Sequence, residues 1–138
     1  MLDELVLYIL DKPGEFSHAL DALSKGDVNV FAFSIDEAGS YAIIRLIVDK
    51  TDRAKDVLAQ NAIGYTVGQV HAVKLPNVPG MLRSLTKLLA DNDFNMKYGY
   101  QSMLATPDSA VVIMKLNSDN GLSALLAANG YIELDNLP

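Results

Sequence analysis

Two short loops carry the residues best suited to chemistry. Residues 11–14 read Asp-Lys-Pro-Gly, and residues 77–80 read Asn-Val-Pro-Gly. In both loops, proline fixes the backbone at the entry to a predicted helix, and glycine lets a ligand approach the main chain closely. The first N–H groups of a helix have no partner within it and lie at the positive end of the helix dipole. Both loops are therefore candidate sites for a carboxylate.

The two loops belong to an internal repeat. Pro13 and Pro79 are 66 residues apart, and the same offset carries Asn29 onto Asn95 and residues 64–65 onto residues 130–131. The alignment slips by two residues after residue 35, because the second copy has a longer turn at 105–109. A shared offset at both ends and in the middle indicates two tandem copies, predicted as residues 1–69 and 70–138.

Both copies show the same order of predicted elements. In the first copy these are a strand at 5–10, a helix from Phe16, strands at 29–36 and 41–48, a helix near 52–60 and a strand from Tyr65. We expect Gly26 to end the first helix in the left-handed conformation. The order predicts an α+β fold of ferredoxin-like βαββαβ type, in two tandem repeats packed as one unit, with both helices of a repeat on one face of an antiparallel sheet. Residues 65–75 must supply the last strand of one copy and the first strand of the next.

On these residues the sequence resembles the ACT domain family, small βαββαβ regulatory domains that bind amino acids in metabolic enzymes. The resemblance covers the whole chain and is similar to stand-alone tandem ACT domain proteins without a catalytic domain. The serine-sensing version of the family implies a His-x-Asn-x-Pro-Gly loop and an asparagine on the neighbouring domain's second strand. Asn77, Pro79 and Gly80 match this loop, whereas Leu75 stands at the histidine position and Asp11 replaces the asparagine in the first copy.

The resemblance implies two ligand sites, each between the loop of one copy and the second strand of the other. One site would pair Asn77 with Asn29, and the other Asp11 with Asn95. Loop amides would hold the carboxylate of an amino acid, and asparagine or aspartate oxygens its ammonium group. The candidate ligand-binding residues are Asp11, Pro13, Gly14, Glu15, Phe16, Asn29, Asn77, Val78, Pro79, Gly80, Met81, Leu82 and Asn95.

The two predicted sites differ in their hydrogen-bonding groups. An ionised aspartate only accepts hydrogen bonds, whereas asparagine also donates them, so we expect one tight site and one weak or empty site per chain. Leu75 in place of histidine favours an apolar, aromatic or histidine ligand side chain over serine.

The same residues also suit purely structural roles. Asp11 and Asn77 are favoured turn and helix-cap residues. Asn29 and Asn95 are able to stabilise the start of a strand, although their presence in both copies favours binding. His18 is expected to be solvated and His71 to be a satisfied, partly buried histidine. Strand aromatics that are able to contact a ligand are more often core residues; these are Phe31, Tyr98 and Tyr100.

Composition narrows the possible functions. The 138 residues include 17 acids and 11 scattered bases, giving a net charge of −6, which weighs against nucleic-acid binding. The chain has no cysteine, and its two histidines lack metal-ligand spacing. No signal peptide and no membrane-length apolar run is apparent. We therefore expect a cytoplasmic protein with no metal, no cofactor, no membrane and no catalytic residue.

Two apolar runs indicate a partner. Residues 5–10 and 42–48 are almost continuously apolar, although a sheet covered by helices on one face should alternate. A second copy of the chain covering the other face, that is a homodimer, explains this best. The alternative is that a few single aliphatic and tyrosine side chains are simply exposed.

The first functional hypothesis is an amino-acid-binding regulatory sensor that acts through ligand-dependent protein contacts, with a metabolic enzyme or regulator as partner. The alternative is a structural dimerisation or interaction module without a small-molecule ligand. An enzyme is the third class and is disfavoured, since no acid, base and nucleophile cluster in the sequence.

Overall fold

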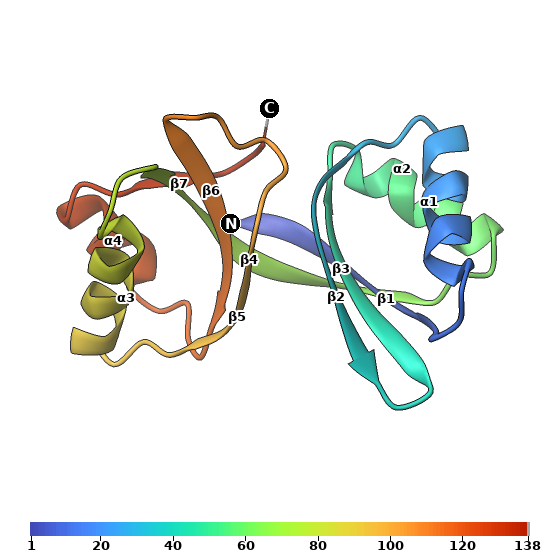
Figure 1. Cartoon of the computed structure of the whole chain (residues 1–138), viewed down its shortest axis with the longest axis horizontal. Coiled ribbons are helices and arrows are strands. Elements are labelled where there is room, and N and C mark those ends of the chain that lie inside the picture. Colours follow the sequence, from blue (N-terminus) through green and yellow to red (C-terminus); the bar gives the residue numbers. More distant parts are fainter. Residues whose placement is uncertain (138) are drawn as a thin grey trace. The chain divides into compact units, whose positions relative to one another are not determined.

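The computed structural model describes residues 1–137 (Figure 1). The chain divides into two compact units. The N-terminal unit is built from Asp3–Gly68, and the C-terminal unit from Gln69–Asn136 together with Met1–Leu2. Each unit is described here by itself.

The N-terminal unit is a four-stranded sheet with two helices on one face (Figure 1). Its elements are β1 (Leu2–Leu10), α1 (Glu15–Lys25), β2 (Val30–Ala38), β3 (Tyr41–Val48), α2 (Thr51–Gln60) and the first part of β4 (Tyr65–Pro76). The strand order is β2-β3-β1-β4. Alternate residues of β1 are buried against the helices, and this core includes Leu5, Leu7, Ile9, Ala19, Leu23, Ile44, Leu46, Val57 and Leu58.

The C-terminal unit repeats this arrangement. It contains the rest of β4, α3 (Met81–Asp91), β5 (Met96–Gln101), β6 (Ser109–Leu116), α4 (Leu122–Ala128) and β7 (Ile132–Leu134). Strand β4 pairs with β6 on one side and with β7 on the other, and β5 lies outside β6 as an edge strand. The core combines Val73, Leu75, Leu85, Leu89, Met114, Leu116, Leu122 and Leu126. The predicted ferredoxin-like α+β fold with two tandem repeats is confirmed.

Strand register matches the two repeats residue by residue. In the N-terminal unit Phe33 pairs with Leu46, and in the C-terminal unit Gly99 pairs with Met114. Both edge strands have a register shift at the same place, between Val30 and Ala32 in β2 and between Met96 and Tyr98 in β5. Phe33 and Gly99, which are 66 residues apart, therefore occupy equivalent positions. The two-residue slip lies in the longer connection between β5 and β6.

The end of α1 differs from the prediction. Gly26 has φ −83° and is not left-handed; the left-handed residue is Asp27, with φ 60°. The reason for glycine at 26 is packing, since a Cβ there would lie 2.4 Å from Val57 Cγ2 on α2. Lys50 Nζ lies 2.8 Å from Asp27 Oδ2, and this hydrogen bond holds the pKa of the Asp27 carboxyl below its usual value.

Gly26→Ala tests this packing. The added methyl group must displace Val57, and we expect the free energy of unfolding to fall by about 1–3 kcal/mol. Gly64→Ala is the matched control, because a Cβ at Gly64 meets nothing within 4 Å. The control should change stability by less than about 0.5 kcal/mol. Urea denaturation measures both variants, and equal losses would contradict the packing argument.

Candidate functional site

Both Pro-Gly loops turn the chain into a helix. Gly14 and Gly80 directly precede α1 and α3 and have φ 90° and 88°, a left-handed conformation that favours glycine. Neither helix start receives a side-chain cap. Asn77 Nδ2 instead donates to Pro107 O at 3.2 Å, and Asp11 has an exposed side chain. The two loop residues therefore do not cap the helices.

The first turn of α3 leaves two amides for a ligand. Met81 N donates to Val78 O at 3.4 Å, and the first bond of the helix runs from Ser84 N to Gly80 O. The amides of Leu82 and Arg83 lie between these and have no partner within the helix. In α1 the equivalent amides are those of Phe16 and Ser17, since Glu15 N donates to Lys12 O.

The second-strand asparagines lie at the other end of each unit. Asn29 and Asn95 directly precede β2 and β5, and both side chains are exposed. The backbone of Asn29 exchanges hydrogen bonds with Asp49, and that of Asn95 with Asn117. A helix of 11 residues, about 16 Å long, separates each asparagine from the loop of its own unit. Their pairing with the loop of the opposite copy stays a prediction.

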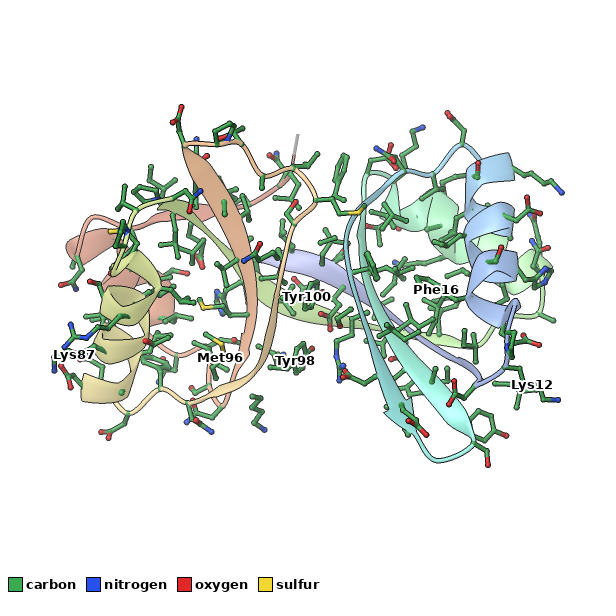
Figure 2. All side chains as sticks on the ribbon, viewed as in Figure 1. Lys12, Phe16, Lys87, Met96, Tyr98 and Tyr100 are labelled. Atoms are coloured by element: carbon green, nitrogen blue, oxygen red, sulfur yellow. The ribbon has the colours of Figure 1, made fainter. Side chains whose placement is uncertain are left out.

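A groove opens beside the start of α3 and along β5. It has a volume of about 350 Å³ and is lined by Leu82, Thr86, Met96, Gly99, Tyr100, Gln101 and Val112. Met96 points from β5 toward α3, whereas Tyr98 and Tyr100 point to the opposite side of the strand (Figure 2). Leu82, Thr86 and Met96 therefore place the groove on the helix-facing side of the edge strand, beside the first turn of α3.

The same place in the N-terminal unit is occupied by aromatic rings. Phe16, on α1, is equivalent to Leu82, and Phe33, on β2, is equivalent to Gly99. The two ring centroids lie 5.7 Å apart, so a ring from the helix meets a ring from the edge strand. Figure 2 shows Phe16 on the sheet-facing side of α1. The two units thus share a backbone but differ in the space between the first helix and the edge strand.

The two helix starts also differ in charge. The first turn of α1 contains Glu15, whereas that of α3 contains no acid. Met81 stands at the position of Glu15, and Arg83 at the position of Ser17. Arg83 is exposed at the positive end of a helix dipole, where an anion is favoured and a cation is not. The α3 start is therefore the better of the two sites for a carboxylate.

Comparison with known proteins identifies the repeat. The family model of the ACT domain pair matches residues 1–138. The chain belongs to this family. No curated protein matches the sequence.

Solved structures share the fold of this ACT pair. Protein BT0572 from Bacteroides thetaiotaomicron has a TM-score of 0.90 at 24% identity, over 96% of this chain and 91% of that chain. The ligand-free regulatory subunit of aspartate kinase from Thermus thermophilus has a TM-score of 0.70 at 18% identity, over 92% and 89%. The corresponding subunit from Thermus flavus has a TM-score of 0.59 at 16% identity, over 93% and 91%.

Leu75, at the histidine position of the loop motif, lies in the core of the ACT pair's C-terminal unit. It is 5% exposed and packs with Leu85 and Leu89 of α3. Its side chain is therefore directed into the core, so Leu75 does not support the predicted preference for an apolar ligand. The groove beside α3 was not predicted from the sequence. The signal that could have revealed the groove is a difference between the two repeats, namely glycine at position 99 where the first repeat has Phe33.

A second groove lies beside the first helix of each unit, so it does not distinguish the two units. Beside α3 it is lined by Lys74, Pro76, Met81, Ser84 and residues 129–132. Beside α1 it is lined by Tyr8, Ile9, Leu10, Glu15, His18, Tyr41 and residues 61–64. It places Met81 on the opposite side of the helix start from Leu82.

The C-terminal unit of the ACT pair contains a buried ionic cluster centred on His71. His71 is 1% exposed, with Nδ1 2.7 Å from Glu133 Oε2 and Nε2 2.8 Å from Asp119 Oδ1. Each ring nitrogen of His71 therefore lies within hydrogen-bond distance of a carboxylate oxygen. As predicted, His71 is satisfied by partners. Both of its ring nitrogens are engaged by carboxylates, and within residues 1–137 no group of three or more His, Asp or Glu side chains is placed to hold a metal.

Glu133 is the central acceptor of this cluster. Burial raises the pKa of its carboxyl, but hydrogen bonds from Ser123 and His71 together outweigh burial, so the pKa lies below the ordinary value of 4.5. Ser123 Oγ donates to Glu133 Oε1 at 2.5 Å. A lowered pKa means that the ionised carboxylate stabilises the fold above pH 4.5 and that this contribution is lost as the pH falls further.

Glu133→Gln should therefore destabilise the C-terminal unit in a pH-dependent way. At pH 7 we expect a loss of about 1–3 kcal/mol, because an amide leaves the buried imidazole with a weaker acceptor. The difference from wild type should shrink at about pH 4, below the ordinary value of 4.5, because the unfolded chain then takes up the proton that the native carboxylate resists. Urea denaturation at both pH values checks this, with the exposed Glu37→Gln as control. A loss that is the same at both pH values would refute it.

Proposed function

We propose that this protein is an amino-acid-binding regulatory module and not an enzyme. A free amino acid binds the C-terminal unit and changes the contacts that the ACT pair makes with another protein. The observation that carries this proposal is the open groove beside the first turn of α3, in which the amides of Leu82 and Arg83 have no partner within the helix. The N-terminal unit has the same fold but carries Glu15 and the rings of Phe16 and Phe33 at the equivalent place.

At the α3 groove, each part of a bound amino acid has a proposed partner. Its carboxylate accepts from the amides of Leu82 and Arg83 and faces the Arg83 guanidinium. Its side chain enters the groove. The ammonium group donates to an oxygen at the rim, where Gln101 carries an exposed amide. Asn77, in the loop before α3, remains a further candidate partner for the same ammonium.

The proposed location and partner of the protein rest on analogy with its structural neighbours. The neighbours from the two Thermus species are named as regulatory subunits of aspartate kinase. By that analogy this chain acts in the cytoplasm on a separate metabolic enzyme or regulator. Among the described residues, no helix is long and apolar enough to span a membrane.

Ligand-dependent thermal stability tests the proposal. A ligand that binds only the folded state adds about 2.7 kcal/mol at a hundred times its dissociation constant. We expect at least one of the twenty amino acids to raise the melting temperature by several degrees, and its N-acetyl and amide derivatives to fail. Gly80 is left unchanged, since any side chain there strains the left-handed backbone.

Two charge reversals one turn apart sharpen this test. Arg83→Glu should lower affinity about tenfold, the effect of losing a hydrogen bond to a charged group. Lys87→Glu is the matched control on the same helix and should have little effect, because Lys87 pairs with Asp91 at 2.9 Å. If no amino acid at millimolar concentration changes the melting temperature or gives heat in calorimetry, the sensor proposal is wrong.

A structural interaction module is the second candidate function, and an apolar sheet face favours it. Tyr8, Leu10 and Tyr41 are 49%, 39% and 53% exposed. Leu10 pairs with Tyr41, and all three point away from the side on which Leu7 and Ile9 enter the core. A second copy of the chain is the occupant that we propose for this face, in either functional class.

Light scattering at micromolar concentration should therefore give the mass of a homodimer. Tyr8→Glu should shift the mass toward the monomer, because a carboxylate cannot be buried in an apolar interface without a partner. Ser24→Glu, an exposed change on α1, is the control and should leave the dimer intact. A monomeric wild-type chain with intact folding would rule out the homodimer.

A further inference from the structure

We infer that the C-terminal unit selects an amino acid with a large apolar side chain, aromatic above all, and that Gly99 makes the room for it. The inference rests on the proposed function and names its ligand class. It also assigns Gly99 as the residue that determines which of the two units binds.

The N-terminal unit shows what fits between the first helix and the edge strand. There the Phe33 ring leaves β2 on the helix-facing side and meets the Phe16 ring of α1. The equivalent position on β5 is Gly99, which has the same cross-strand partner position. Gly99 places no ring there, so a groove stays open between α3 and β5 beside the side chain of Met96.

Burial of the strand beneath confirms that the space is open. Ile44 on β3 is fully buried in the N-terminal unit. Its equivalent on β6, Val112, is only half-buried and lines the groove. Apolar groove walls from Leu82, Met96 and Val112 thus remain partly in contact with water. A ligand side chain that covers them gains the free energy of burying apolar surface.

The rim of the groove is more polar than its N-terminal counterpart. Thr86 stands at the position of Leu20, and Gln101 at the position of Ile35. Thr86 Oγ1 donates to carbonyls of its own helix, whereas Gln101 extends an exposed amide. An apolar floor with a polar rim suits a ligand that has a large side chain and a charged backbone end.

The surroundings of Gly99 leave little room for a side chain at this position. A Cβ there would lie 3.0 Å from Met96 Sδ and 3.2 Å from Ile113 O. Met96 is able to move, but the carbonyl of Ile113 belongs to β6. Position 99 therefore has little tolerance for a side chain of its own, and the volume of about 350 Å³ is left to a ligand.

Calorimetry with a graded series of amino acids tests the inference. We expect one ligand per chain and affinity that rises from alanine through leucine and methionine to phenylalanine, by roughly 10- to 100-fold in total. Gly99→Phe should lower affinity at least about tenfold by filling the groove from the strand. Circular dichroism checks that this variant still folds.

A second variant keeps the inference testable if Gly99→Phe does not fold. Leu82→Trp fills the groove from the helix, at a residue whose side chain is 54% exposed, and should also lower affinity about tenfold. Lys87→Trp, at an exposed position on the same helix, is the matched control and should stay within about twofold of wild type.

The outcomes separate this inference from the function on which it rests. If no amino acid binds, the proposed function fails and this inference with it. If an amino acid binds but small and large side chains bind equally, or folded Gly99→Phe and Leu82→Trp keep wild-type affinity, only this inference is overturned. Two equal sites per chain would likewise overturn it, since the Phe16–Phe33 pair fills the second one.

Discussion

Each unit depends on one constraint: the apolar side of its sheet must be covered by two short helices. Neither helix has much apolar surface, so the few inward side chains of α1 and α2, or of α3 and α4, must pack closely on alternate strand residues. Contact between the helices is correspondingly tight. At Gly26 it leaves no room for even a methyl group against Val57. The first helix is thereby fixed over the sheet, and with it the turn that precedes it.

Packing against the helices constrains the edge strand of each unit least. The helices cover the central strands fully, whereas the space between the start of the first helix and β2 or β5 lies at the margin of the core. In the N-terminal unit two phenylalanine rings fill the margin, and Ile44 beneath them is buried. In the C-terminal unit Gly99 leaves it open. Because the margin contributes least to the core, the two repeats are able to differ there without losing the fold, and the difference creates a candidate site in one of them.

The C-terminal unit also differs from its counterpart in the core itself. Its strand β4 carries His71 where β1 carries Leu5, which is buried among aliphatic side chains. A buried imidazole requires partners. Asp119 and Glu133 supply them from the segment before α4 and from β7. The cluster therefore joins the short final strand to the centre of the sheet by charge-assisted hydrogen bonds, a role that apolar packing serves elsewhere.

The fold could be predicted from the sequence because the signals for its helices, strands and turns are local. Strand patterns, helical spacing and the repeated Pro-Gly turns depend on neighbouring residues, and the 66-residue offset between Pro13 and Pro79 doubled every signal. Gly26 shows the limit of such reasoning: a glycine after a helix predicts a left-handed residue, but the actual requirement came from Val57, 31 positions away. The candidate site was predicted only in part for the same reason. Leu82 and the loop glycines could be named from their motif, whereas the direction of Leu75 into the core, and the meeting of Phe16 with Phe33 where Leu82 and Gly99 leave a groove, are set by contacts between elements distant in the chain.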